Sequence, residues 1–251
     1  MRMNRRLVPF SFLIASACAL LIPGMSQAQS APAPPTYLRV TLARIKPGMR
    51  TAWLDGVQAR LMPALNKAGV KSVAIYQTVF GNEYEYYTVR RLQRFTLSGA
   101  QGARVRALGT KGAAEQEDSL GKYVQSVHVI VIAPQTELSN TPAGEHPPVC
   151  VFALRRVLPG KMQDYRNFVR TEVLPVYKKA GEYFEVYQRV YGANDNDFVS
   201  MACVNKFSDL AGGSLPARVL GQNGAEKLFA EWDAIAPLVS ITVRHRLDMS
   251  Y

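Results

Sequence analysis

Two kinds of hydrophobic pattern alternate along the chain and predict its elements. The stretch YLRVTLARI at 37–45 alternates in polarity and is rich in β-branched residues, which predicts a strand that ends at Pro47-Gly48. Residues 50–69 place Trp53, Val57 and further apolar residues at helical spacing, with Gly69 as the stop. Pro63 lies inside this segment, so we expect its last turns to be kinked.

The following segments complete one structural unit. The stretches SVAIYQTVF and YEYYTVRRL read as two strands joined across Gly81-Asn82, a hairpin signal. A second helical region at 99–124 is broken by Gly109 and Gly112, and VHVIVIA closes the unit as a last strand. The order βαββαβ is that of a ferredoxin-like sheet, which carries helices on one face only.

An internal repeat then fixes the organisation of the chain. At a shift of 112 residues Pro47-Gly48 matches Pro159-Gly160, and Lys67-Ala68-Gly69 matches Lys179-Ala180-Gly181. Between these blocks Tyr76-Gln77 matches Tyr187-Gln188 at a shift of 111. A register kept over about 90 residues predicts two homologous halves. Since each sheet leaves one face uncovered, we expect an α+β fold in which two βαββαβ repeats form one pseudo-dimeric barrel.

The segments outside the two repeats define the remaining parts of the chain. Residues 1–28 combine three Arg, an apolar run and a Ser26-Gln27-Ala28 cleavage pattern, which predicts a secretory signal peptide. We place a flexible lead-in at 29–36, the first repeat at 37–138, a Pro-rich linker at 139–147 and the second repeat at 148–251. This layout predicts a periplasmic or secreted protein without a membrane segment once the leader is removed.

The repeated motifs resemble those of the dimeric α+β barrel superfamily and, within it, NIPSNAP-like proteins. The resemblance rests on the strand that ends in Lys46-Pro47-Gly48, the helix that ends in Lys67-Ala68-Gly69 and the strand with Tyr76-Gln77. It covers nearly all of the chain after the leader, twice. The superfamily includes cofactor-free monooxygenases, haem enzymes and proteins without known chemistry, so the resemblance implies the fold and leaves the activity open.

Charge and composition limit the kinds of molecule that the protein is expected to bind. The chain has 30 Lys and Arg against 19 Asp and Glu, and removal of the leader leaves a net charge of about +8. These charges are scattered rather than clustered, which indicates a solvated basic surface and no nucleic-acid partner. Three His and no CxxC motif argue against a structural zinc site. The oligomeric state is left open.

Strand alternation predicts which side chains face the interior. We assign the more apolar row of the first strands, with Leu38 and Cys150, to the helices, and likewise Val127 and Val239 of the last strands. The opposite rows mix aromatic, hydroxyl and charged groups, as a ligand pocket does. The alternative is that the arginines lie at strand ends and reach water. The predicted ligand-binding residues are Tyr76, Tyr86, Thr88, Arg90, Arg155, Tyr187, Arg189, Ser200 and Arg244.

Histidine supplies the candidate catalytic group. His128 lies on the last strand of the first half and is the candidate general base, although a lone strand histidine is more often structural. We expect His146, in the linker, to be exposed. The haem-binding members of the superfamily use an axial histidine in the C-terminal half, where this chain has only His245 in a context that does not match. We therefore expect no cofactor and no metal.

Two cysteines complete the candidate residues. Cys150 lies on the first strand of the second half and Cys203 on the third, which are adjacent and antiparallel in this fold. We expect the two to be close, either disulfide-bonded in an oxidising compartment or reduced as small buried residues. Alternation places both on the helix side.

Three functions remain compatible with the sequence. In the first, the barrel binds a small ligand, such as an anion, without converting it. In the second, it is a cofactor-independent oxygenase with His128 as base and Tyr76 or Tyr187 orienting the substrate. In the third, it is a structural or interaction protein with a filled barrel. An interior cavity that touches His128 would favour the oxygenase, and a cavity without a buried base would favour the binding protein.

Overall fold

The computed structural model describes residues 36–92 and 102–249; the predicted leader at 1–28 and most of the lead-in lie outside them. Each half contributes four strands. The first half has β1 (Tyr37–Ile45), β2 (Val73–Phe80), β3 (Glu85–Leu92) and β4 (Val124–Pro134). The second has β5 (Val149–Arg156), β6 (Tyr183–Tyr191), β7 (Asp197–Val204) and β8 (Leu238–Arg246). The predicted order βαββαβ therefore recurs in both halves.

The eight strands close into one antiparallel barrel in the order β1-β3-β2-β8-β5-β7-β6-β4. Within a half, the first strand lies between the third and the fourth. Two seams join the halves: β2 pairs with β8, and β4 pairs with β6. Closure removes the free edges that two separate sheets would expose. The predicted pseudo-dimeric barrel within one chain is thus confirmed.

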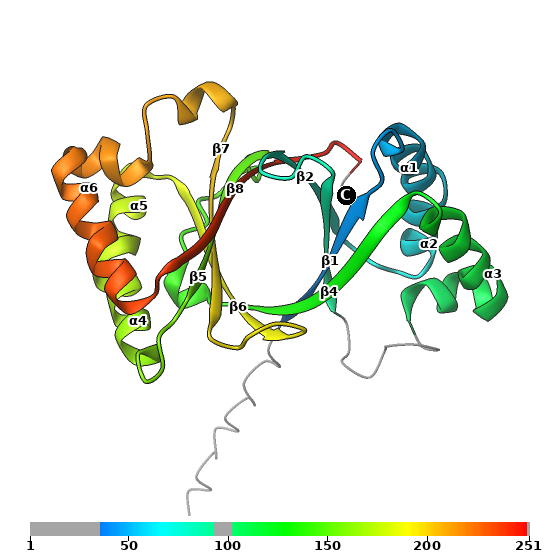
Figure 1. Ribbon diagram of the computed structural model, residues 1–251, viewed down its shortest axis with the longest axis horizontal. Coiled ribbons are helices and arrows are strands. Elements are labelled where there is room, and N and C mark those ends of the chain that lie inside the picture. The colour runs from blue at the N-terminus through cyan, green and yellow to red at the C-terminus, as the bar shows by residue number, and fades with distance from the viewer. Residues whose placement is uncertain (1–35, 93–101, 250–251) are drawn as a thin grey trace, which may run out of the picture. The chain divides into compact units, whose positions relative to one another are not determined.

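The helices form two groups on opposite sides of the barrel (Figure 1). The first comprises α1 (Arg50–Gly56), α2 (Met62–Lys67) and α3 (Ala103–Gly121); the second comprises α4 (Met162–Phe168), α5 (Leu174–Ala180) and α6 (Leu215–Ile235). Their apolar faces meet the outer faces of the strands, with Trp53 and Val57 at the centre of one core and Phe168 and Trp232 in the other.

Both predicted interruptions of the helices are present. A π-helical turn at Val57–Leu61 precedes Pro63, and a matching turn at Val169–Val173 precedes Pro175. The wider turn accommodates a proline that lacks an N–H and crowds the preceding turn. Gly109 breaks α3 with φ 72°, and its repeat counterpart Gly221 breaks α6 with φ 75°.

The outer faces of β4 and β8 differ from the prediction. Their alternation is as expected, but the helices do not cover these two strands: Val127 is 57% exposed and Ile241 is 59% exposed. Both strands take part in the seams between the halves, away from the centre of each helix group. Among the described helices, none is long and apolar enough to span a membrane.

Candidate functional site

The barrel encloses an inner cavity of about 120 Å³. A cavity needs only ~10–15 Å³ to hold a single water molecule, so this cavity is large enough for a small organic molecule. Its walls come from all eight strands and are mostly apolar and aromatic. The lining residues are Val40, Tyr76, Tyr87, Val89, Ile130, Ile132, Phe152, Leu154, Tyr187, Arg189, Val199, Met201, Ser240, Thr242 and Arg244.

An outer pocket of about 900 Å³ adjoins the inner cavity at one end of the barrel. The two spaces share Tyr76, Val89, Tyr187 and Met201 on their walls. Tyr76 and Tyr187 are the two tyrosines that recur in the internal repeat, and both lie inside the barrel as alternation predicts. They therefore stand between the outer pocket and the inner cavity. Burial raises the pKa of Tyr76 to about 12, so its hydroxyl is neutral near pH 7.

The first and third strands of each half face the opposite way from the prediction. In β1 and β5 the apolar rows with Val40 and Phe152 line the cavity, and in β3 and β7 the rows with Tyr87 and Met201 do so. The barrel interior is itself largely apolar, so the more apolar row of a strand does not identify the helix side. The aromatic residues of the helices pack against the opposite rows, where Trp53 contacts Tyr86 and Tyr165 contacts Phe198.

Five predicted ligand-binding residues therefore do not line the inner cavity. Tyr86 is fully buried under the first helix group, with its ring 4.7 Å from that of Trp53. Thr88 belongs to the same outward row, because its neighbours Tyr87 and Val89 line the cavity. Arg90 also belongs to that row and lines the outer pocket.

Arg155 and Ser200 are the other two corrections. The Arg155 guanidinium lies 4.3 Å from the centre of the Trp232 ring and forms an ion pair with Asp233, so it packs under α6. Ser200 is 7% exposed and lies between Phe198 and Ala202, which pack against the second helix group. Both side chains belong to the structural core rather than to the cavity.

Arg244 is the central charged group of the cavity. It is 9% exposed, and its guanidinium lies between two rings, 3.4 Å from the centre of Tyr87 and 4.2 Å from that of Phe152. In the described part of the chain no carboxylate forms an ion pair with it, and its Nε has no hydrogen-bond partner. Burial lowers the pKa of Arg244 to about 10, which leaves it charged near pH 7.

The surrounding charges do not neutralise Arg244. Glu85 acts on it electrostatically but is held by Arg44 at 2.7 Å. The second cavity arginine, Arg189, pairs with Asp197 at 3.2 Å, and that carboxylate is shared with Arg156. Arg244 thus keeps an uncompensated positive charge within apolar walls, an arrangement that favours an anion.

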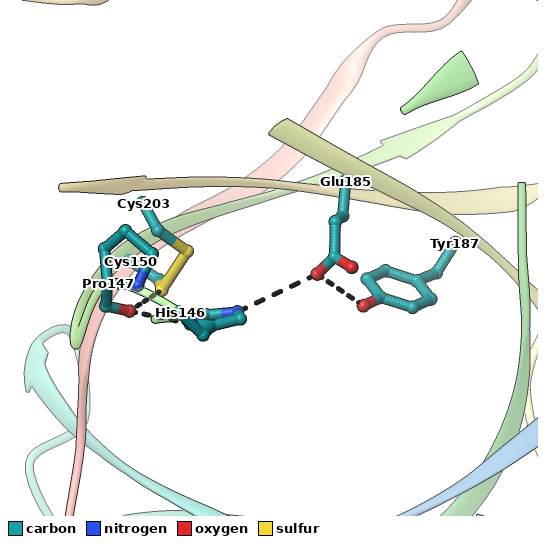
Figure 2. The surroundings of a disulfide bond; sticks show 6 residues. All are labelled: His146, Pro147, Cys150, Glu185, Tyr187 and Cys203. Atoms are coloured by element: carbon teal, nitrogen blue, oxygen red, sulfur yellow. Dashed lines mark hydrogen bonds and ion pairs between the residues drawn. A yellow bond between two sulfur atoms is a disulfide. The ribbon is translucent and has the colours of Figure 1, made fainter. Parts of the chain in front are cut away.

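A second polar group lies in the outer pocket, which Glu185, Tyr187 and His146 line. The Tyr187 hydroxyl donates a hydrogen bond of 2.7 Å to Glu185 Oε2, and His146 Nε2 lies 3.8 Å from the same oxygen (Figure 2). His146 Nδ1 donates to the Pro147 carbonyl at 2.7 Å. His146 was expected to be exposed; instead it is half-buried, with its ring 4.4 Å from that of Tyr183.

The two remaining histidines lie apart from the cavity. His128 is on the inward-facing row of β4 but at the opposite end of the barrel, where it is exposed and its Nε2 lies 2.8 Å from the Gly192 carbonyl oxygen. It is not among the residues that line the inner cavity. His245 follows the inward-facing Arg244 on β8, so strand alternation turns its side chain outward. The centre of its ring lies 5.8 Å from that of the Phe207 ring. Among the described residues that line the inner cavity there is no histidine, and His146 lines the outer pocket.

Cys150 and Cys203 form a disulfide, with a Cα–Cα distance of 4.1 Å. They are directly opposite each other in the β5–β7 pairing, as strand topology predicts. Their side chains lie inside the barrel with Tyr76 and Met201, not on the helix side. This difference follows from the reversed face of β5 and β7. The disulfide lies beside His146 and Pro147 (Figure 2).

Sequence reasoning missed several residues that build this site. Glu185 and His146 are not among the predicted site residues, nor are Tyr87 and Phe152, which cover the two faces of Arg244. A signal for Glu185 exists: in Tyr183-x-Glu185-x-Tyr187, strand alternation places one carboxylate between two tyrosines on one face. No comparable sequence signal points to the ring pair around Arg244.

Comparison with known proteins supports the fold. No family model matches the chain, and no curated protein matches it in sequence. An anthrone oxidase-like protein is similar in structure, with a TM-score of 0.60 and 9% identity over 87% of this chain and 93% of that one. A proposed monooxygenase from Lactobacillus acidophilus NCFM has a TM-score of 0.54 and 11% identity over 85% and 94%.

A NIPSNAP family protein from Agrobacterium tumefaciens str. C58 is also similar, with a TM-score of 0.33 and 12% identity over 45% of this chain and 97% of that one. At these identities the likenesses concern the fold alone. The fold is that of the dimeric α+β barrel superfamily, with both halves in one chain.

Proposed function

We propose that the barrel binds a small organic anion in its inner cavity, with the anionic group on Arg244. The observation that supports this most directly is a buried, charged guanidinium without a carboxylate partner among the described residues. An isolated buried charge is costly unless it is paired. An anionic ligand would supply the missing partner.

The geometry around Arg244 also suggests the kind of ligand. Tyr87 and Phe152 cover both faces of the guanidinium, so only its N–H edges are available for hydrogen bonds. Those edges match the two oxygens of a carboxylate. The apolar and aromatic walls favour a compact apolar or aromatic body attached to that group.

The two alternative functions fare differently. A filled barrel does not agree with the cavity. A cofactor-independent oxygenase receives some support from the two similar structures described as a proposed monooxygenase and as anthrone oxidase-like. His128, its candidate base, lies outside the cavity lining, so this alternative requires a different base.

A binding experiment tests the proposal. Benzoate and its neutral analogue benzamide are titrated into the protein by calorimetry. We expect benzoate to bind more tightly, and Arg244→Met to weaken it ~10–100-fold, the loss of ~1.5–3 kcal/mol that is typical of a hydrogen bond to a charged group. Arg218→Met removes an arginine on α6 and serves as the control. Equal binding of both probes, or unchanged benzoate binding in Arg244→Met, would refute the proposal.

We further propose that the protein is secreted or periplasmic. The leader pattern at 1–28 and the disulfide support this, because disulfides persist in oxidising compartments. Expression in a bacterial host, followed by fractionation and N-terminal sequencing, tests it. We expect a periplasmic product that begins after Ala28; a cytoplasmic product that retains the leader would contradict it.

A further inference from the structure

Glu185 lacks a permanently charged partner, which distinguishes it from the other carboxylates of the barrel interior. Glu85 is paired with Arg44, and Asp197 with Arg156 and Arg189. Within the described residues, the only ion-pairing partner of Glu185 is His146, at 3.8 Å. A carboxylate that no Arg or Lys holds in the ionised state is able to accept and release a proton.

Tyrosine hydroxyls and His146 surround the Glu185 carboxylate and fix its position. Because His146 Nδ1 donates its proton to the Pro147 carbonyl, the other ring nitrogen faces Glu185. The separation of 3.8 Å is too long for a direct hydrogen bond. Tyr187 donates to Oε2 at 2.7 Å and itself lines the inner cavity. Glu185 lines the outer pocket, so its proton can exchange with solvent.

Glu185 lines the outer pocket and Arg244 lines the inner cavity, and Tyr76 lies on the walls of both. Glu185 lacks a permanently charged cationic partner, and Arg244 lacks an anionic partner. A molecule that gives up a proton while it acquires negative charge would satisfy both. Proton abstraction from a weak acid is a reaction that would use both groups.

We propose that Glu185 is a general base that removes a proton from a small carbon acid, such as a 2-oxo acid, whose enolate is held by Arg244. This inference rests on the proposed function. The C–H bond next to the carbonyl breaks, its electron pair moves into the enolate, and the proton forms an O–H bond on Glu185. Return of a proton to carbon or to the enolate oxygen completes an exchange or a tautomerisation, and no oxidant is consumed.

The internal repeat offers independent support for a specialised role. The counterpart of Glu185 at the shift of 111 is Ala74, and the counterpart of Arg244 at the shift of 112 is Ile132. Both counterparts lie inside the barrel, yet neither carries a charge. The barrel therefore does not require a carboxylate or a guanidinium at these places.

Hydrogen–deuterium exchange tests the base. Pyruvate and phenylpyruvate are incubated with the protein in D₂O, and loss of the protons next to the carbonyl is followed by proton NMR. We expect exchange above the buffer rate, and a decrease of ~100-fold in Glu185→Gln, the lower range for loss of general base catalysis. Glu185→Asp should recover part of the lost rate because it restores the carboxylate. Glu182→Gln, outside the barrel, is the matched control.

The outcomes separate the two proposals. Benzoate binding by each variant shows that it is folded and that Arg244 is intact. If neither substrate exchanges faster than in buffer, or if Glu185→Gln and the native protein exchange equally fast, Glu185 is not a general base. Benzoate binding by the native protein would in that case still support the anion site. Failure of the native protein to bind benzoate would instead refute the anion site.

Discussion

The two halves of the barrel share a backbone plan but differ in their chemistry. Both have the same strand order, the same π-helical turn before a proline and the same glycine break in the long helix. Inside the barrel, however, the second half carries Arg244, Glu185, Arg189 and the disulfide. Their counterparts in the first half are Ile132, Ala74, Thr78 and the pair Leu38 and Arg91.

This difference separates what the fold requires from what is specific to the site. Features present in both halves, such as the repeat counterparts Tyr76 and Tyr187, can serve either the fold or the site. Features present in one half only cannot be requirements of the repeat, because the other half folds without them. The strongest candidates for function are therefore the asymmetric charged residues of the second half.

The largest expected effect concerns the disulfide, which only the second half has. It closes a loop with a sequence separation of 53. Replacing Cys150 and Cys203 by Ser should lower the free energy of unfolding by about 4 kcal/mol in the chain-entropy model. Urea unfolding with and without reductant measures this. Unfolded without reductant, the protein that begins after Ala28 should show no titratable thiol; two would contradict the bond.

The seams between the halves provide the next comparison. Gly192 and its counterpart Gly81 both have positive φ, 74° and 129°. A side chain at Gly192 would collide with the backbone oxygen of Val129, whereas at Gly81 it would meet the movable Thr242 methyl at 3.0 Å. Gly192→Ala should therefore cost about 3 kcal/mol and Gly81→Ala about 1–2 kcal/mol of unfolding free energy. Equal costs in urea unfolding would show that the two seams are equally adaptable.

Arg155 tests the corrected strand faces. Its buried guanidinium packs on Trp232 and pairs with Asp233, which is half exposed and can be solvated after the pair is broken. Arg155→Met should lower the free energy of unfolding by about 2 kcal/mol, less than for a fully buried pair. Benzoate affinity should stay unchanged. A variant with native stability but weakened benzoate binding would place Arg155 in the site after all.

Sequence alone was sufficient for the fold because its signals repeat. The register at 112, the turn at Pro47-Gly48 and the proline within the first helix each occur twice, so each half corroborates the other. The predicted inward-facing row of side chains was correct in β2, β4, β6 and β8 but was the opposite row in the other four strands. A barrel lined by Val40, Phe152 and similar residues is as apolar as the helix side, and periodicity cannot tell two apolar faces apart.

The site was harder to predict for a related reason. Alternation correctly turned Arg244 and Arg189 inward, but it could not show that Asp197 pairs with one and that aromatic rings enclose the other. Those facts depend on contacts between strands far apart in sequence. His146 illustrates the same limit, because a linker residue gains its role only when the chain folds back over Glu185.

The smallest expected effect has the opposite sign and compares Arg244 with Arg155. Since Arg244 lacks a carboxylate partner among the described residues, we expect it to lower the stability of the ligand-free protein. Arg244→Met, which fills much of the same space between Tyr87 and Phe152, should raise the unfolding free energy by about 1 kcal/mol. Saturating benzoate should stabilise the native protein but not the variant. Destabilisation by Arg244→Met would mean that the two rings already compensate the charge, and that an anionic ligand is not needed to explain it.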